Sequence, residues 1–598
     1  MYVALLVLLT LLVYAGTWGH GFVNYDDDVT IINLTLIREL SLERLPAFFR
    51  PDIHRGLPEY MPLKNLSYAV DHALFGLDPR GFRVQQQLWY LAAVVLLYGW
   101  LRDVLGALRE RLPGAVPEAR VPLLAFLVAL LFALHPAHVE SVTWLSGRKD
   151  VLSGAFMLGA LLCAFRWSGQ LRAWGYLAGA LLCMVLGLLS KPTAVVLPAL
   201  FLVQDWVRRE PLVQVLRARA PLYLGSGALA LAFILFYTGL TSEHAGALAA
   251  VQDRLFEGAA PLRWGQQYAR YVAIGIAPLG LSPLLPPELL DPRPLSVASL
   301  VGVGVLVVLI AATLVGVRRR SPWLLALGLF ALPLLPSVLV PAWGQYLAAR
   351  YMFHAVIGVA LALVLAGAML VAARPQLVRP LVLAALGLAG TWGLLTVQYN
   401  ATWERGSTLW LGALEHHPRF TALHELGAGA AVAEGDRALA VGILSRCLEV
   451  DAEHAPCLAQ MGELLLVPSP EQGEAMLRRA LPRDAGPAHR VLARHLLRTG
   501  RAAEGLALLE AHLEGRPTAA ATFALLAHLA SAAGQGDKAL GYGRHIARAA
   551  AANHPASPPP AAPLRAIAQR AGDAELLERI DAAAHCGRSD CFLEALGW

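Results

Sequence analysis

Long apolar segments fill the first two thirds of this chain, and they constrain its fold more than any other feature. Of the 598 residues, 57% are hydrophobic and 15% are charged, a balance that excludes an ordinary soluble protein. The apolar runs lie within residues 1–399, whereas residues 400–598 are rich in Ala, Arg, Glu and His. The sequence therefore predicts an all-α fold in two domains: a polytopic membrane helical bundle over 1–399 and a soluble domain over 400–598.

The apolar runs and the arginines between them predict about eleven membrane spans, with the arginine-rich loops facing the cytoplasm. In chain order the spans are 1–18, 84–101, a run ending near 134, a run beginning near 151, runs ending near 190 and 206, and then 220–240, 297–317, 322–341, 351–373 and 380–398. The first run lacks a basic start and a clear cleavage site, so we expect a retained span and not a signal peptide.

The segment 266–285 is moderately apolar but is interrupted by prolines. Counting it as a span would move Arg318-Arg319-Arg320 to the side opposite the other arginine loops. We therefore expect a surface-lying or re-entrant helix there. With this topology, the unusual polar motifs of the membrane half and everything after residue 399 lie on the non-cytoplasmic side, where interfacial charges are functional by default.

The first of these motifs is Asn24-Tyr25-Asp26-Asp27-Asp28, a few residues past the first span. Three adjacent carboxylates repel one another and are hard to desolvate. Such a run makes chemical sense if one carboxylate takes a proton in a reaction and another carboxylate holds the first in place. The alternative is a solvated acidic cap on the following helix, because Asp favours helix N-termini.

The loop 135–150 is the second motif, and it is dense in functional groups. Arg148 and Lys149 could hold a phosphate at the bilayer surface, Arg through a bidentate fork. Three other residues of the loop could bind a cation or orient the carboxylates: His135, His138 and Glu140. Alternatively, the two histidines only cap helix ends.

Two further cations stand at span ends on the same face. Lys191 could neutralise a lipid phosphate at the headgroup level, or its side chain could simply extend to water. Arg350 precedes Tyr351 at the start of another span, and this pair could equally be an interfacial anchor.

The C-terminal region shows helical periodicity with regularly spaced breaks. The breaks fall near Gly435-Asp436, Pro468, Gly500 and Gly534, at intervals close to the roughly 34-residue period of tetratricopeptide repeats. We expect about four repeats over 418–552, a proline linker at 558–560 and a capping helix pair over 561–597. A generic helical solenoid is the alternative.

The cysteines and the net charge indicate which disulfides, metal sites and partners to expect. The spacings predict two disulfides in an oxidising compartment, Cys447–Cys457 and Cys586–Cys591, with Cys163 and Cys183 as inert packing residues. No cysteine and histidine cluster has zinc spacing, so we predict no zinc site. The charge of +6 comes largely from loop arginines without interleaved aromatics, so we expect no nucleic-acid partner.

The ordered set of motifs resembles one family. It comprises Tyr25-Asp26-Asp27 with Asn33, Pro62-Leu63, Gly76…Pro79-x-Gly81-Phe82, His135-Pro-x-His138-x-Glu140, Gly147-Arg148-x-Asp150, Ser190-Lys191 and Arg350-Tyr351. The chain is similar in this respect to the multispan GT-C glycosyltransferases with a C-terminal tetratricopeptide domain. That family includes the transmembrane and tetratricopeptide O-mannosyltransferases and bacterial relatives. The resemblance extends over nearly the whole chain.

The resemblance implies an inverting enzyme that moves a sugar, mannose or a similar hexose, from a polyprenyl phosphate to a hydroxyl acceptor such as a protein Ser or Thr. It implies Asp26 as general base and Asp27 as its supporting carboxylate. Three cations would stabilise the departing phosphate: Arg148, Lys191 and Arg350. Five further residues would support the site: His135, His138, Glu140, Asp150 and Tyr351. No cofactor is required, although a divalent cation held by His138 and Glu140 stays open.

This chain also departs from the family pattern. Where relatives usually carry His, Asn, a second His and an acidic residue, it has Arg83, Gln86, Tyr90 and Ala349. These substitutions keep a rival hypothesis open, a catalytically silent membrane scaffold whose repeats recruit envelope proteins. The Ala/Arg-rich composition favours a bacterial inner membrane with periplasmic repeats. The alternative is the endoplasmic reticulum with lumenal repeats, where the sequon Asn400-Ala401-Thr402 would matter.

Overall fold

The computed structural model describes residues 1–51, 60–109, 111–112, 114–167, 173–206, 212–242, 258, 260–290, 293–339, 347–484, 486–513, 520–553, 565, 569 and 574–583. Every regular element in these ranges is a helix, which confirms the all-α fold class. The chain divides into two compact units, Met1–Pro418 and Arg419–Trp598. The division falls later than residue 399 because a helix after the last span packs on the first unit.

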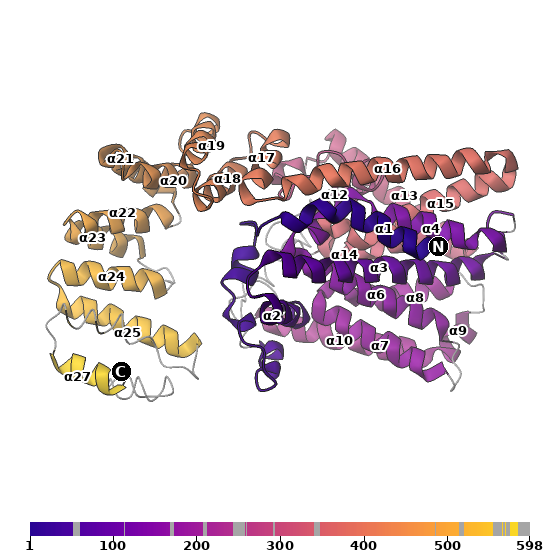
Figure 1. Cartoon of the computed structure of the whole chain (residues 1–598), viewed down its shortest axis with the longest axis horizontal. Coiled ribbons are helices and arrows are strands. Elements are labelled where there is room, and N and C mark those ends of the chain that lie inside the picture. Colours follow the sequence, from indigo (N-terminus) through magenta and orange to yellow (C-terminus); the bar gives the residue numbers. More distant parts are fainter. Residues whose placement is uncertain are drawn as a thin grey trace. The chain divides into compact units, whose positions relative to one another are not determined.

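The first unit is a bundle of helices of very different lengths (Figure 1). In chain order these are α1 (Tyr2–Tyr14), α2 (Pro62–Phe75), α3 (Pro79–Leu108), α4 (Val121–Ala133), α5 (Val139–Val142), α6 (Arg148–Arg166), α7 (Trp174–Ser190), α8 (Leu197–Trp206), α9 (Leu212–Ala218), α10 (Ala220–Ser242), α12 (Ala260–Ile276), α13 (Val297–Arg319), α14 (Trp323–Leu339), α15 (Met352–Ala373), α16 (Val378–Thr402) and α17 (Gly406–His416). Figure 1 shows α3, α6, α15 and α16 lying along nearly the same axis, as helices that cross a bilayer do.

Each of the predicted spans coincides with a helix, but their lengths differ. In the described part of the chain, six helices are long and apolar enough to cross a membrane: Tyr2–Gly19, Pro79–Leu108, Ala220–Tyr237, Val297–Arg319, Ala349–Ala373 and Pro375–Thr402. The bent pair Glu118–Ala133 and Pro136–Val142 would make a seventh. Three other predicted spans are shorter apolar helices, Trp174–Ser190, Pro192–Trp206 and Trp323–Val338. The one predicted span not yet accounted for, which begins near residue 151, corresponds to α6. This helix begins with the charged residues Arg148, Lys149 and Asp150.

The bend in that pair, 53°, lies at His135-Pro136. Proline disfavours helix at the residue before it, so α4 ends there, as predicted. His135 then caps the next short helix, because its Nδ1 accepts a hydrogen bond from Ala137 N–H at 3.1 Å. Every residue from Leu124 to Ala155 is buried. The bend therefore folds a polar loop into the protein, where its backbone groups find partners away from lipid.

Helix α12 corresponds to the segment expected to lie on the surface or re-enter. It is not among the helices that could cross the membrane, and it ends at Ile276, before the proline-rich stretch. It packs closely on α13, since a Cβ at Gly265 would come within 2.6 Å of the Gly302 backbone. A hydrogen bond from Gln266 Nε2 to Ser299 Oγ at 2.9 Å joins the same two helices.

The second unit consists of consecutive helix pairs over its described residues (Figure 1). The pairs are α18 (Thr421–Ala433) with α19 (Arg437–Val450), α20 (Ala455–Leu465) with α21 (Pro470–Ala480), α22 (Pro487–Arg498) with α23 (Ala502–Leu513), and α24 (Ala520–Ala532) with α25 (Gly536–Asn553). The turn inside each pair falls at a predicted break. At Gly435, for example, φ is +84°, a left-handed conformation that favours glycine at a helix C-terminus.

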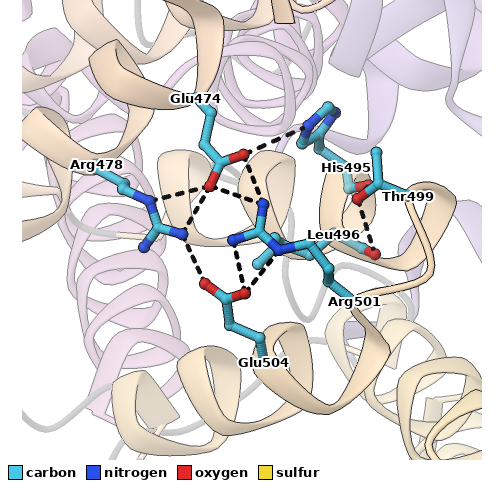
Figure 2. A network of polar contacts seen from close by, with 7 residues as sticks. All are labelled: Glu474, Arg478, His495, Leu496, Thr499, Arg501 and Glu504. Atoms are coloured by element: carbon cyan, nitrogen blue, oxygen red, sulfur yellow. Dashed lines mark hydrogen bonds and ion pairs between the residues drawn. The ribbon is translucent and has the colours of Figure 1, made fainter. Parts of the chain in front are cut away.

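Ion pairs link successive helices of this unit. Glu474 on α21 and Glu504 on α23 both bind Arg478 and Arg501, as Figure 2 shows. His495 Nε2 on α22 lies 3.8 Å from Glu474. The network therefore joins three consecutive helices. Of the predicted capping pair, only α27 (Ala574–Ala583) and two single residues are described; the proline linker lies outside the described residues.

The cysteine predictions are confirmed where the structure describes them. Cys447 and Cys457 form a disulfide that joins the end of α19 to the start of α20. Cys163 and Cys183 are free and half-buried among the apolar helices. The second predicted pair, Cys586–Cys591, lies outside the described residues.

Candidate active site

Asp27 anchors the acidic loop. Its carboxylate is buried, and Oδ2 accepts a hydrogen bond from Val23 N–H at 3.1 Å. Oδ1 accepts hydrogen bonds from the backbone N–H (3.0 Å) and the hydroxyl of Ser146. Burial raises the pKa of Asp27 to about 6, and the hydrogen bonds from Ser146 and Val23 limit that rise. The role expected for Asp27, that of a supporting carboxylate, fits this position.

Tyr25 fixes the loop on the other side of the acidic run. Its ring stacks on Trp144 with centroids 4.8 Å apart, and Trp144 Nε1–H donates to the Tyr25 carbonyl at 2.6 Å. The Tyr25 hydroxyl donates to the Pro283 carbonyl at 3.0 Å and receives a hydrogen bond from Arg350 at 3.3 Å. Tyr25 therefore connects the loop to three separate parts of the first unit.

Asp26 lies between these two anchored residues and differs from both. It is exposed, and its φ of +69° places it in the left-handed region, which costs a non-glycine residue about 1 kcal/mol. Its carbonyl accepts hydrogen bonds from both the N–H and the hydroxyl of Thr30, each at 2.8 Å. The neighbours therefore hold Asp26 in a strained conformation with its carboxylate open to solvent, whereas a simple helix cap needs no such strain.

Arg350 and Glu140 form a buried ion pair beside Tyr25. The guanidinium of Arg350 lies 3.2 Å from Glu140 Oε2, which also accepts a hydrogen bond from Arg350 N–H at 3.3 Å. The guanidinium also lies over three aromatic rings, those of Tyr25 (5.9 Å), Trp144 (5.4 Å) and Tyr351 (5.3 Å). These aromatic rings hold the Arg350 guanidinium next to Tyr25, the residue that precedes Asp26.

Lys191 also lies close to the Tyr351 ring. Its ammonium binds Asp150 and lies 5.7 Å from the centre of the Tyr351 ring. Lys149 and Arg350 are close enough to Lys191 to act on it electrostatically. Lys191, Lys149 and Arg350 therefore lie near two buried carboxylates, those of Asp150 and Glu140. Ammonium and guanidinium groups are the side chains that bind a phosphate in proteins.

The structure gives Arg148 another role than the expected phosphate contact. Its side chain is fully buried and binds Asp71 on α2. It also donates to Gln86 Oε1 (3.0 Å), Gln85 Oε1 (2.8 Å) and the Phe82 carbonyl, and it lies over the Tyr68 ring. Protein groups therefore occupy every nitrogen of the guanidinium, and we do not retain Arg148 as a donor-phosphate ligand.

The two histidines are also occupied by protein partners. His138 is buried, with Nδ1 2.8 Å from the Tyr90 hydroxyl and Nε2 3.2 Å from the Phe353 carbonyl. His135 Nε2 lies 3.3 Å from the Gly275 carbonyl, and its Nδ1 caps the helix that follows. Both side chains therefore support the bend, and His138 with Glu140 does not fit a cation site, since neither ring nitrogen of His138 is left for a metal ion.

The residues that depart from the family pattern also bind the loops together. Arg83 is buried and donates to the carbonyls of His20 (3.0 Å), Gly21 (2.7 Å) and Thr143 (2.7 Å). Gln86 Nε2 donates to the Ser141 carbonyl at 2.7 Å. These contacts connect the start of the acidic loop to the 141–144 segment, so the substitutions are accommodated in a well-paired interior.

Sequence reasoning missed several residues of this site. Ser146, Trp144 and Trp410 all contact the acidic loop, and Asp71 pairs with Arg148. The partners are separated by 77 to 386 positions in the chain. No local pattern signals such contacts.

Comparisons with known proteins reveal relatives but no matching family profile. The human protein O-mannosyl-transferase TMTC2 is 30% identical over 150 residues, which cover 24% of this chain and 16% of the relative. The Drosophila melanogaster protein O-mannosyl-transferase Tmtc1 is 32% identical over 192 residues, 31% of this chain and 20% of the relative. The human protein O-mannosyl-transferase TMTC4 is 31% identical over 182 residues, which cover 29% of this chain and 24% of the relative.

In each case the match spans less than a quarter of the relative's own length. The names of these relatives agree with the family that the ordered motifs indicated. The apolar helices agree with the same assignment. The chain is thus an integral membrane protein that resembles the transmembrane and tetratricopeptide O-mannosyltransferases, as its motifs predicted.

Proposed function

We propose that this protein is an inverting GT-C-type glycosyltransferase that moves a hexose, such as mannose, from a polyprenyl phosphate to a hydroxyl acceptor on a protein. One observation carries the proposal. Asp26 is exposed and strained, and Tyr25, the residue before it, binds the buried cation Arg350. A candidate base and a candidate phosphate ligand therefore belong to one connected set of residues.

The chemistry follows from these two groups. The Asp26 carboxylate takes the proton from the acceptor hydroxyl, whose oxygen then forms a bond to the anomeric carbon of the sugar. The bond between that carbon and the phosphate oxygen breaks, and the phosphate leaves with the bonding electron pair. Attack opposite the departing group inverts the anomeric configuration. Asp27 keeps the loop in place through Ser146.

Arg350 and Lys191 stabilise the charge that develops on the leaving phosphate. Both cations are already oriented, Arg350 by Glu140 and aromatic rings and Lys191 by Asp150 and Tyr351. Preorganised cations in a water-poor site stabilise a developing charge strongly, because they need no reorientation during the reaction. The partners of the protein are accordingly a polyprenyl-linked sugar, the lipid bilayer and a protein or peptide acceptor.

The repeats over residues 419–553 present or select the acceptor and lie outside the cytoplasm, in a bacterium in the periplasm. The arginine loops support this orientation, since they favour the cytoplasmic side. Protease added to intact spheroplasts should then remove the repeats. If the repeats are cut only after the inner membrane is opened, the orientation and the location of the reaction are both wrong.

The rival function is a silent scaffold, and donor turnover separates the two. Purified protein is mixed with a panel of polyprenyl-phosphate hexoses and peptides that contain Ser and Thr. The proposal expects one donor to be consumed and the product to carry the inverted linkage. If no donor is consumed while the repeats still capture a protein from the envelope, the scaffold replaces the enzyme.

A further inference from the structure

Helix α17, which follows the last span, contacts the acidic loop directly. Trp410 on α17 is fully buried, and its Nε1–H donates to Asn24 Oδ1 at 2.8 Å across 386 positions of sequence. Its ring meets the Tyr25 ring edge-on, with centroids 5.3 Å apart and planes at 90°. Just before α17, the Glu404 carbonyl accepts a hydrogen bond from Gly21 N–H at 3.0 Å.

These contacts lie on the residues that precede Asp26. Asp26 has φ of +69°, and an exposed residue keeps such a conformation when its surroundings over-determine it. On the C-terminal side, Asp27 is held by Ser146 and Val23. On the N-terminal side, Trp410 holds both Asn24 and the ring of Tyr25. The strained residue therefore lies between two fixed points, and Trp410 supplies part of one of them.

We infer that Trp410 is a positioning residue for Asp26 and acts on it through Asn24 and Tyr25. The effect on catalysis rests on the proposed function, whereas the effect on the loop does not. The indole N–H fixes the Asn24 side chain, and the indole ring limits the rotation of Tyr25. A base must lie within hydrogen-bond reach of the acceptor hydroxyl, so a shift of this loop slows transfer without weakening the binding of the donor phosphate.

Trp100 provides a matched control. It is also fully buried, and its Nε1–H donates to Gln204 Oε1 at 3.2 Å. That hydrogen bond joins α3 to α8 and not to the acidic loop. Trp100→Phe therefore removes the same chemical groups as Trp410→Phe, from an equally buried site, and reports what the loss of one indole hydrogen bond does to the fold.

The test compares Trp410→Phe, Asn24→Leu, their double variant and Trp100→Phe in the full-length protein. Hydrogen–deuterium exchange measures the backbone amides of residues 21–30, and kinetics with the polyprenyl-phosphate hexose measures kcat and the donor KM. We expect faster exchange in this segment for both single loop variants, and a fall in kcat of about tenfold or more with donor KM nearly unchanged. The kcat of the double variant should be no lower than that of the single variants, because Trp410→Phe and Asn24→Leu remove the same hydrogen bond.

Several results would overturn the inference. Unchanged exchange over residues 21–30 in both Trp410→Phe and Asn24→Leu would show that Trp410 does not fix the loop. An equal fall in kcat in Trp100→Phe would indicate a general effect on the fold. Additive falls in kcat in the double variant would show that Trp410 and Asn24 act separately. If the wild-type protein consumes no donor, the proposed function fails, and the exchange data still decide whether Trp410 fixes the loop.

Discussion

Asp27 Oδ1 accepts hydrogen bonds from both the backbone N–H and the hydroxyl of Ser146, a residue 119 positions later in the chain. This contact joins the acidic loop after the first span to the turn before α6. It leaves Asp26 exposed between anchored neighbours. The two carboxylates therefore differ in their surroundings: that of Asp27 is buried and holds the loop, whereas that of Asp26 faces solvent.

The raised pKa of Asp27 predicts an acid limb in the rate of transfer. Burial raises this pKa from 3.8 to about 6. The ionised form accepts all the loop hydrogen bonds, so protonation below about pH 6 should rearrange these contacts and lower kcat without destabilising the fold. Because the folded-state pKa is raised, the stability that the protonated group contributes is present below pH 3.8 and is lost as the pH rises through about 6.

Ser146→Ala tests this assignment. The variant removes a hydrogen bond that favours the ionised form, so the pKa of Asp27 should rise further. The acid limb of the pH–kcat profile should then move to higher pH. An acid limb that stays in place in Ser146→Ala would assign that ionisation to another group.

Truncation of Arg148 and of Lys191 should differ in its effect on donor binding. Arg148→Ala leaves the carboxylate of Asp71 buried and unpaired, which should lower the free energy of unfolding by about 3–5 kcal/mol. Lys191→Ala likewise leaves the buried carboxylate of Asp150 without its ion-pair partner and should also lower stability, but it alone should weaken donor binding and slow transfer by about 10²-fold. Thermal unfolding and donor titration of the two variants measure both effects. A stable Arg148→Ala protein with weakened donor binding would return Arg148 to the phosphate site.

The disulfide Cys447–Cys457 should stabilise the repeats modestly. The two cysteines are 10 positions apart, and so short a loop gives about 2–3 kcal/mol. Cys447→Ser with Cys457→Ser should lower the stability of the repeats by that amount. Thiol titration of the denatured, unreduced wild-type protein should find free thiols at Cys163 and Cys183, and more than two would contradict the predicted pairing.

The ion network of Figure 2 should make the repeats sensitive to acid. Burial acts to raise the pKa of Glu474, but hydrogen bonds from Arg501 and Arg478 outweigh it and lower the pKa below 4.5. The stability from this group is therefore present above pH 4.5 and is lost as the pH falls through the lower value. Glu474→Gln should lower the free energy of unfolding by about 1 kcal/mol or less at neutral pH.

A control variant separates the network from an ordinary surface pair. Glu463 lies 3.9 Å from Arg494, and both side chains are about half exposed. Glu463→Gln should therefore change the melting temperature very little. If the two variants melt alike at neutral pH, the network adds nothing beyond a single surface contact. If Glu474→Gln still differs from wild type in acid, the titrating group is misassigned.

The sequence was most informative where a local pattern has one physical meaning. Apolar runs and proline positions predicted the helices of the first unit, and regularly spaced breaks predicted the turns at Gly435, Gly500 and Gly534. The acidic run was recognised because adjacent carboxylates are costly to bury. In each case the evidence lies within a few residues, where helix propensity and desolvation act.

The sequence was least informative where distant residues meet. Arg148 beside Lys149 looks like a phosphate site, yet Asp71 on α2 lies against Arg148 and pairs with it. His135 and His138 look like ligands, yet Tyr90 and the carbonyls of Gly275 and Phe353 occupy their nitrogens. A charge or an imidazole is available to a substrate only if its surroundings leave it so, and tertiary packing determines those surroundings.

The exchange of Asp26 for asparagine tests the central claim most directly. Asp26→Asn keeps the size and polarity of the side chain but cannot accept the proton, so transfer should fall by about 10²–10⁴-fold. Donor binding should survive, because the proposed ligands of the phosphate are Lys191 and Arg350 and not Asp26. Asp28→Asn, at the other exposed carboxylate of the run, should transfer sugar at nearly the normal rate. If Asp26→Asn transfers sugar as fast as wild type, Asp26 is not the base and the proposed mechanism is wrong.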